Sequence, residues 1–396
     1  MRIPSEKPIL LVIELDYHVD ILGFFLASID KTRFTVHCIA TPAVAAKIPD
    51  AGKAGVTVHE TTRNKEIVKL LADIGADLVF FNTCASRYRF WAGHCPPNAT
   101  VRIHNINTSF IPGKSIHIGF NFYELRKAFT HILWRQCIHL DRLYLSRFLR
   151  KAASYNFLSE TNARYFGDVR PDLLHKKGPV FPSAAYNADF YKENPGTPLR
   201  ITVPGTLEQK RKDFDAIRRF VRILAGTEHL VELHFAGRIP ASSAAFVNEL
   251  KKSRTDRFEI FTYGDFLPQH VFDELLRSSD LLFFPMIRYT RYKIFREVYG
   301  KSKISGSLND LIRFGKYAVM PEFYDPDPAL RPLAFSYDDT EAGMRRAYEA
   351  ARDSYLGNRN GYAEKVEMHA RHYAFGPLSH TQNELLAKLT HSHGKI

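Results

Sequence analysis

Cysteine and long apolar runs are both scarce in this chain of 396 residues. The four cysteines (Cys38, Cys84, Cys95 and Cys137) follow no paired spacing, so we expect reduced thiols rather than a disulfide framework. No run of about 18 apolar residues could span a bilayer, and residues 1–7 lead into an apolar stretch without a signal-peptide pattern. These absences favour a cytoplasmic protein.

Acidic residues are also outnumbered, with 42 Asp and Glu against 55 Lys and Arg, a net charge of +13. This surplus predicts an anionic partner, which could be nucleotide phosphates, an acidic membrane surface or nucleic acid. The histidines near the C-terminus match no closed zinc pattern, so no metal site is expected. They are His369, His372, His380, His391 and His393.

Strand and helix patterns alternate through the first half of the chain. We expect strands at 8–15, 34–40, 56–60, 77–82, 100–106 and 155–158, and helices at 21–29, 64–74 and 160–166. This alternation predicts a doubly wound α/β domain. Ligands of such sheets bind beyond the carboxyl ends of the strands. That rule singles out Asp16, His18, Asn82, His104 and Asn105.

Residues 120–153 interleave aromatic and aliphatic side chains with cations. The segment includes Phe120, Phe122, Phe129, Leu133, Trp134, Leu143, Arg126, Arg135, Arg142, Arg147 and Arg150. A basic amphipathic helix of this kind can lie in an anionic membrane interface. A long core helix with its arginines in water has the same pattern, so both interpretations stay open.

The second half starts a new α/β run after residues 176–196, an irregular stretch rich in Pro, Asn and Lys that we take as the domain boundary. We expect strands at 200–203, 231–235, 258–262, 281–284 and 333–336, and helices at 214–224, 242–252, 270–278 and 341–352. A helical tail covers 362–388. The expected division is 1–178, 179–365 and a tail at 366–396.

A loop of small residues before a helix suggests an anion site in the second half. Ser305, Gly306 and Ser307 open this helix, and Lys303 lies in the loop before it. Unpaired N–H groups and the helix dipole favour an anion there, although an ordinary capped helix start has the same residues. A cationic run at 210–212 follows another strand end.

An ordered set of motifs runs through the second half: VPGT followed by KRKDF, then LHFAG, FTYG, LLFFP and IRFGKYAV. In these motifs, over most of residues 155–337, the chain resembles the GT-B glycosyltransferases, particularly the nucleotide-sugar-dependent family 4. The resemblance implies two Rossmann-like doubly wound domains facing across a cleft, with the C-terminal helix crossing back to the first domain. The N-terminal domain would bind the acceptor and the C-terminal domain the donor.

Site residues follow from that resemblance. The donor-binding set is Gly205, Thr206, Lys210, Arg211, Tyr263, Gly264, Glu297, Lys303, Ser305, Gly306, Ser307, Asn309 and Asp310. Where the family has a Gly-Arg turn, this chain has Gly205-Thr206. The positive charge that binds the donor diphosphate would therefore come from Lys210, Arg211 or Lys212. The paired-glutamate motif is absent, and Asp310, or alternatively Glu297, stands for the glutamate that holds the ribose. Residues 263–267 are expected to flank the base.

In the first half, the resemblance implies that His104 faces the reacting sugar, with Asp16 and His18 as further catalytic candidates. A strand-end histidine suits hydrogen bonding or proton transfer near neutral pH. A structural histidine with satisfied hydrogen bonds fits the same position equally well.

The implied function is transfer of a sugar from a nucleoside diphosphate sugar to a glycan or lipid-linked acceptor, with retention and without a metal or other cofactor. Surface polysaccharide or glycolipid biosynthesis, at the inner face of the plasma membrane, would suit it. A nucleotide-sugar epimerase of the same fold and a non-catalytic basic binding protein remain alternatives. We expect no nucleic acid partner, because the cations are spread through both halves rather than gathered in one stripe.

Overall fold

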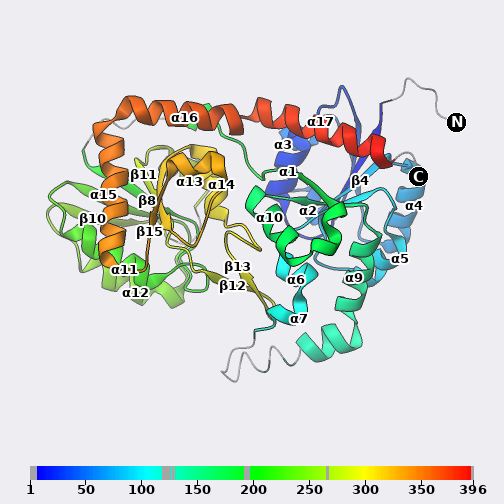
Figure 1. Ribbon diagram of the computed structural model, residues 1–396, viewed down its shortest axis with the longest axis horizontal. Helices are drawn as coiled ribbons and strands as arrows, with labels where there is room; N and C mark the ends of the chain where they lie inside the picture. The colour runs from blue at the N-terminus through cyan, green and yellow to red at the C-terminus, as the bar shows by residue number, and fades with distance from the viewer. Residues whose placement is uncertain are drawn as a thin grey trace. The chain divides into compact units, whose positions relative to one another are not determined.

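The computed structural model describes residues 7–117, 126, 129, 131–190, 197–264 and 267–393. By its internal contacts the chain forms two units (Figure 1). The first comprises Met1–Ala184, Arg291–Glu297 and Gly376–Ile396, and the second comprises Ala185–Thr290 and Val298–Phe375. The first unit is therefore assembled from three separate stretches of sequence.

A parallel sheet of seven strands forms the first unit, in the order β3-β2-β1-β4-β5-β6-β7. The strands are β1 (Ile9–Glu14), β2 (Thr35–Ala40), β3 (Val56–Glu60), β4 (Leu78–Thr83), β5 (Ala99–Arg102), β6 (Ser154–Phe157) and β7 (Lys177–Val180). In the pairing register Ile9 lies opposite Thr35 of β2, and Leu10 lies opposite Leu78 of β4. The order of connections reverses on the two sides of β1, which is where sheets of this kind bind ligands.

Helices cover both faces of this sheet because its central strands are apolar on both faces. The longer helices are α1 (Val19–Ser28), α4 (Asn64–Ile74), α5 (Tyr88–His94), α9 (Asp141–Lys151), α10 (Glu160–Val169) and α17 (Phe375–His393). The remaining helical segments are α2 (Pro42–Ala45), α3 (Asp50–Lys53), α6 (Ile106–Phe110), α7 (Pro112–Ser115), the π-helix η1 (His131–Ile138) and the 3-10 helix η2 (Pro171–Lys176).

Alternate residues of β1 enter two separate cores. Leu11 packs in one core with Phe81, and Leu10 packs in the other with Phe80 and with Leu386 of α17. Ser379 Oγ of α17 also donates a hydrogen bond to the carbonyl of Ser28, 2.6 Å away. The C-terminal helix, red in Figure 1, therefore returns to the first unit, as the resemblance implied.

The second unit is a parallel sheet of six strands in the order β10-β9-β8-β11-β14-β15. The strands are β8 (Leu199–Pro204), β9 (Val231–Ala236), β10 (Phe258–Thr262), β11 (Leu281–Phe283), β14 (Tyr317–Pro321) and β15 (Ala334–Tyr337). The helices are α11 (Phe214–Ala225), α12 (Ala241–Lys251), α13 (Gln269–Arg277), α14 (Gly306–Phe314), α15 (Glu341–Gly357) and α16 (Arg359–Tyr373), with the 3-10 turns η3 (Ala188–Phe190) and η4 (Pro328–Leu333). Here the connections reverse between β8 and β11.

The structure differs from the sequence expectations in several elements. Residues 177–180 form β7 at the end of the first sheet, where Pro179 is tolerated because an edge strand has unpaired N–H positions. Strand β5 ends at Arg102, four residues early. A hairpin of β12 (Tyr289–Tyr292) and β13 (Phe295–Val298) was not expected, and the tail divides at Ala374 into α16 and α17.

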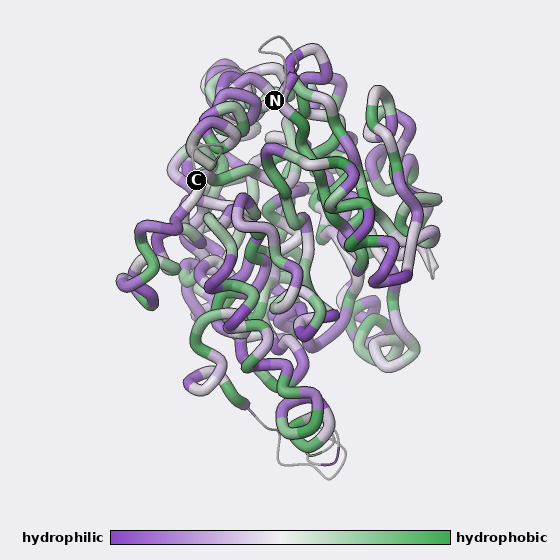
Figure 2. Tube along the Cα trace, turned by 90° about the vertical axis from the view of Figure 1, so that its right-hand side faces the viewer, coloured by the Kyte–Doolittle hydropathy of each residue, from purple (hydrophilic) through white to green (hydrophobic). Residues whose placement is uncertain are grey.

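Hydrophobic and hydrophilic residues alternate along the trace (Figure 2). In the part of the chain that the structure describes, no helix combines the length and the apolar character needed to cross a membrane.

Candidate active site

The three catalytic side chains suggested by the sequence lie together at the carboxyl ends of the strands of the first unit. The Asp16 carboxylate accepts hydrogen bonds from Ala85 N at 2.8 Å and Ser86 Oγ at 2.6 Å, both in the loop after β4. The rings of His18 and His104 are stacked, with centroids 4.3 Å apart and planes 7° from parallel. Asp16, His18 and His104 therefore gather where the strand order reverses.

A hydrogen bond to the backbone determines which nitrogen of His104 can react. Its Nε2 lies 2.8 Å from the carbonyl oxygen of Asn82, which can only accept, so Nε2 carries the proton. In the neutral ring the lone pair is then on Nδ1. A cavity of about 40 Å³ is lined by His18, His104 and Asn105. Within the described chain the buried Asn105 Oδ1 finds no hydrogen-bond partner. This cluster can accept hydrogen bonds or a proton from a bound hydroxyl.

A buried charged network lies beneath this cluster. Asn82 Nδ2 donates to Glu14 Oε2 at 2.6 Å, and Arg102 donates to Asn82 Oδ1 at 2.6 Å and to Asn156 Oδ1 at 2.8 Å. Burial raises the pKa of Glu14 and lowers the pKa of Arg102 to about 9. Because Asn82 also holds His104, the network orients the histidine. The sequence analysis named Asn82 but not Glu14 or Arg102. The signal that could have identified each of them is that it is the one charged residue in an otherwise apolar strand.

Glu297 is fully buried within the first unit, at the hairpin strand β13. Its Oε1 accepts hydrogen bonds from Thr108 N at 2.8 Å and Thr108 Oγ1 at 2.6 Å, and its Oε2 accepts one from Asn107 N at 3.2 Å. These N–H groups open α6, whose own N-cap residue, Asn105, makes no capping hydrogen bond. Glu297 therefore caps α6, and its place in the donor-binding set stays a prediction.

In the second unit, two glycine loops meet backbone to backbone beyond β8 and β9. Gly205, with φ +81°, donates from its N to Ala236 O at 2.8 Å. A Cβ on Gly237 would lie 2.4 Å from the carbonyl carbon and oxygen of Gly205. Only glycine permits both the left-handed backbone at Gly205 and this close approach, which brings Thr206 to the same edge of the sheet.

Within the cationic run, Lys212 is the side chain that turns inward. Lys212 is 6% exposed and its Nζ donates to Pro204 O at 2.7 Å. The side chains of Lys210 and Arg211 are 72% and 61% exposed and lie 3.1 and 3.6 Å from Glu208. Sequence reasoning put Lys210 and Arg211 forward, because it could not tell which of three adjacent cations faces the sheet edge.

Lys212 is electrostatically coupled to Asp310 of α14. Burial lowers the pKa of Lys212 to about 8, against the attraction of Asp310. Burial raises the pKa of Asp310 to about 7, against the attraction of Arg313 and Lys212. The loop after β8 and the first turns of α14 are therefore neighbours.

At the N-terminus of α14, Ser305 and Ser307 are buried and Gly306 is exposed. The Ser305 side chain accepts a hydrogen bond from Ser307 N at 3.3 Å. Gly306 is exposed, and a Cβ placed on it would meet nothing within 4 Å. The N–H groups of this first turn are those that bind anions at helix N-termini. Lys303 lies in the loop before the helix, and Asn309 lies beside Asp310 in it.

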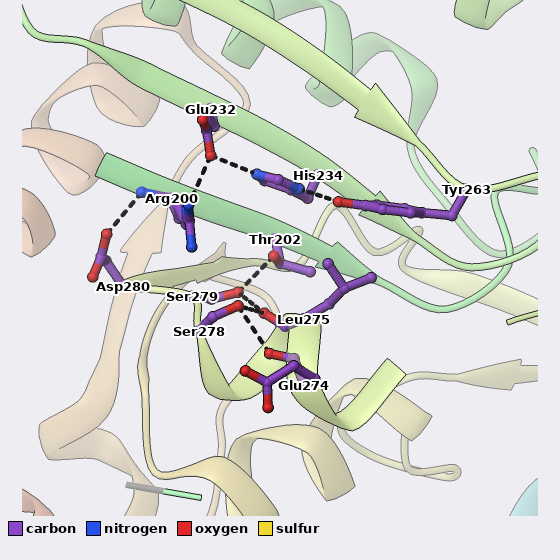
Figure 3. A network of polar contacts seen from close by, with 10 residues as sticks. All are labelled: Arg200, Thr202, Glu232, His234, Tyr263, Glu274, Leu275, Ser278, Ser279 and Asp280. Atoms are coloured by element: carbon purple, nitrogen blue, oxygen red, sulfur yellow. Dashed lines mark hydrogen bonds and ion pairs between the residues drawn. The ribbon is translucent and has the colours of Figure 1, made fainter. Parts of the chain in front are cut away.

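A chain of polar contacts fixes Tyr263 after β10 (Figure 3). The Tyr263 hydroxyl is hydrogen-bonded to His234 Nδ1, whose Nε2 lies 3.1 Å from Glu232 Oε2. Arg200 Nε donates to the same carboxylate at 3.0 Å. Burial lowers the pKa of His234 and raises that of Tyr263. Gly264 follows with φ +82°. Residues 265 and 266 of the expected base-flanking segment lie outside the described residues.

Among the described residues, no three His, Cys, Asp or Glu side chains are placed to hold a metal ion. Buried His369, which the sequence had singled out, has Nε2 2.8 Å from the Ile312 carbonyl oxygen.

The part of segment 120–153 that the structure describes is largely exposed. Phe120, Phe122 and most of 118–130 lie outside the described residues. Of α9, only Phe148 and Leu149 are buried. Six large apolar side chains are exposed, and we call them the apolar face: Phe129, Leu133, Trp134, Ile138, Leu140 and Leu143. The interpretation of 120–153 as a core helix therefore holds only for the end of the segment, at Phe148 and Leu149.

No protein-family model matches the chain, and no curated protein matches it. Solved structures do match along nearly their whole length. A glycosyltransferase from Rickettsia africae ESF-5 has a TM-score of 0.60 at 11% identity, covering 97% of this chain and 99% of that chain. Anabaena Alr3699/HepE in complex with UDP has a TM-score of 0.60 at 11% identity, covering 96% and 100%. The α,α-trehalose-phosphate synthase (UDP-forming) from Burkholderia vietnamiensis has a TM-score of 0.59 at 12% identity, covering 99% and 100%.

These likenesses define the fold. The chain has the GT-B glycosyltransferase fold, with two parallel-sheet Rossmann-like domains, as the sequence resemblance implied. Membership of family 4 stays a prediction.

Proposed function

We propose that this chain is a glycosyltransferase that transfers a sugar from a nucleoside diphosphate sugar to a glycan or lipid-linked acceptor. The observation that carries the proposal is the buried Lys212 ammonium, coupled to Asp310 at the strand-end loops of the second unit. Burying an ammonium group away from water costs free energy, and such groups are found where negative charge develops during a reaction. A departing nucleoside diphosphate is such a charge.

The donor residues take roles that suit a diphosphate leaving group. Lys212, Lys303 and the amides of 305–307 stabilise the diphosphate, and the backbones of Gly205 and Thr206 allow its close approach. Asp310 accepts hydrogen bonds from the ribose, and Tyr263 and Gly264 flank the base. We propose no metal, because helix dipole and lysine supply the positive charge. HepE in complex with UDP and the UDP-forming synthase share this fold, which makes UDP the first nucleotide to test.

The first unit supplies the acceptor side of the reaction. His104, Asp16 and His18 meet the acceptor and the reacting sugar, with the neutral Nδ1 of His104 as hydrogen-bond or proton acceptor. Retention of the anomeric configuration and a place in surface polysaccharide or glycolipid synthesis complete the proposal.

Nucleotide titration tests the donor site. Isothermal titration should compare UDP, GDP, ADP and CMP on the wild-type chain, and then the tightest ligand on two variants. Lys212→Met should weaken binding about 10- to 100-fold, since a hydrogen bond to a charged group contributes about 1.5–3 kcal/mol. Lys210→Ala is the matched control, because its ammonium is exposed, and should change affinity less than about threefold. Equal losses in the two variants would contradict the assignment of Lys212.

We further propose that the apolar face rests on an anionic membrane surface. Apolar rings at a lipid boundary combine with nearby cations to bind anionic lipid. Arg142, Arg147 and Arg150 lie on α9 beside the exposed leucines. A lipid-linked or surface-glycan acceptor would then be presented at the membrane on which the enzyme sits.

A native thiol reports on this contact. Burial raises the pKa of Cys38 and Cys95 to about 12 and that of Cys84 far above its usual value, whereas Cys137 of η1 is exposed. A polarity-sensitive maleimide dye at pH 7 should therefore label Cys137, and its emission should shift to the blue with anionic vesicles.

Two matched leucines provide the control. Leu133 of the apolar face and Leu230 of the second unit are each 47% exposed. Leu133→Ser should weaken vesicle binding about tenfold, and Leu230→Ser should not, because burying one such side chain contributes about 1.5–3 kcal/mol. No spectral shift with anionic vesicles, or an equal effect of both substitutions, would refute the membrane contact.

A further inference from the structure

A second and larger cavity lies in the first unit beside the candidate catalytic cluster. Its volume is about 140 Å³, and it is bounded by α6, α9, the end of α10 and the hairpin tip. Because one water needs about 10–15 Å³ by this kind of measure, the cavity has room for on the order of ten waters. That is enough for a phosphoryl group with part of an attached molecule.

The charges around the cavity do not balance. Four charged side chains line it: Asp141, Arg142, Arg170 and Lys293. Asp141 is paired with Arg135 at 2.7 Å, and Arg170 is paired with Asp172 at 2.6 Å. Among the described residues, Arg142 and Lys293 have no carboxylate within 4.0 Å, so each adds an uncompensated positive charge.

A backbone feature lies at each of these two cations. Lys293 occupies the hairpin turn with φ +57°, a conformation that side-chain-bearing residues seldom adopt and that often occurs at functional sites. Arg142 lies across Gly113, where an added Cβ would be 3.3 Å from its guanidinium. The Lys293 ammonium is also partly desolvated, which lowers its pKa, so a bound anion would stabilise its charged form.

Hydroxyl groups also line the cavity. Tyr88, Ser109, Ser146 and Tyr292 line it. Burial raises the pKa of Tyr88 and Tyr292, so both stay neutral O–H groups. A lining that combines cations with neutral hydroxyl donors suits the oxygens of a phosphoryl group. The cavity also shares Tyr88, Ser109 and Tyr292 with the small cavity of His18 and His104.

We propose that this cavity binds a phosphoryl group of the acceptor, with Arg142 and Lys293 as its charge partners, and so directs a neighbouring acceptor hydroxyl toward His104. The proposal rests on the proposed function only in identifying the phosphoryl group as part of an acceptor. Two sources share this chemistry, a soluble sugar phosphate and a lipid phosphate. The apolar face continues from the same helix, α9, that supplies Arg142.

Binding of pyrophosphate to the Lys212→Met variant tests the cavity apart from the donor site. Arg142→Gln and Lys293→Gln should each weaken binding about tenfold or more, because each removes a charged partner. Lys293→Arg should restore much of it. Lys69→Gln, at an exposed position of α4, is the control, since Lys69 does not line the cavity. Thermal melting of every variant confirms folding. Unchanged pyrophosphate affinity in Arg142→Gln and Lys293→Gln overturns the proposal.

Competition then identifies the source of the phosphoryl group. Displacement of pyrophosphate by glycerol 3-phosphate supports a soluble phosphate. Displacement only by vesicles containing phosphatidic acid, and not by phosphatidylcholine vesicles, supports a lipid phosphate. If neither glycerol 3-phosphate nor phosphatidic acid vesicles displace pyrophosphate, the proposal that the cavity binds a phosphoryl group is overturned. UDP titration of Arg142→Gln with Lys212 intact separates this result from the donor site: absence of UDP binding would refute the proposed function and leave the cavity result standing.

Discussion

Replacing Glu297 with glutamine should loosen the first turn of α6 and the hairpin tip that carries Lys293. The carboxylate is 0% exposed and its two oxygens accept three hydrogen bonds, from Asn107 N and from the N and Oγ1 of Thr108. Glutamine keeps one acceptor oxygen but turns an NH2 group toward at least one N–H donor. It also removes the negative charge at the helix N-terminus.

The size of the effect follows from these contacts. A lost hydrogen bond to a charged group costs about 1.5–3 kcal/mol, and the lost charge–dipole attraction adds about 0.3–1 kcal/mol. The sum is about 2–4 kcal/mol, which is roughly 30- to 1,000-fold in a local opening equilibrium. A chain of two units does not unfold in one step, so a local measurement is needed.

Amide hydrogen exchange at Asn107 and Thr108 is that measurement. Protection of both amides should fall by the factor above in Glu297→Gln, while amides of β1 keep theirs. Glu364→Gln, at an exposed position of α16, is the control and should change neither. Unchanged exchange at Asn107 and Thr108 in Glu297→Gln would refute the capping role.

Two further predictions concern the second unit. Burial lowers the pKa of His369 to about 4, below the unfolded value of 6.5, so its contribution to stability is complete above pH 6.5 and is lost as the pH falls toward 4. The loss in the free energy of unfolding is up to about 3 kcal/mol. His369→Gln keeps a donor toward Ile312 O but cannot titrate, so it should reduce the difference between the urea midpoints at pH 7.5 and pH 5.0. An unaltered difference would contradict this prediction. Gly237→Ala should destabilise the second unit by about 1–3 kcal/mol through overpacking and weaken UDP binding, because the new methyl meets the Gly205 carbonyl. Gly357→Ala, with nothing within 4 Å of the added Cβ, is the control, and equal melting shifts for the two would speak against the close contact.

Continuous apolar runs made the sheets predictable from sequence. Residues 8–15 hold β1, and the helix at 64–74 and the strands at 56–60 and 258–262 were predicted with the bounds that the structure has. Buried parallel strands and amphipathic helices leave strong local patterns because each residue's environment follows from its position in the element. Strand β7 left no such pattern, because Gly178 and Pro179 are typical of loops.

The site was less predictable, because its details depend on residues far apart in the sequence. The gathering of Asp16, His18 and His104 followed from a general property of parallel sheets. The choice of Lys212 over Lys210 depends on the path of one loop around Pro204. The role of Glu297 depends on a partner 189 positions away, and no spacing in the sequence indicates it.

The division of the first unit among three stretches of chain bears on how the protein is made. Leu386 fills the core beside Phe25, and Asn383 donates to Ser28 O at 2.9 Å. During synthesis, residues 7–184 leave the ribosome long before α17. Until α17 follows, the part of their core that Leu386 covers stays exposed to water. The N-terminal part of the chain, although translated first, can complete its fold only after α17 has left the ribosome.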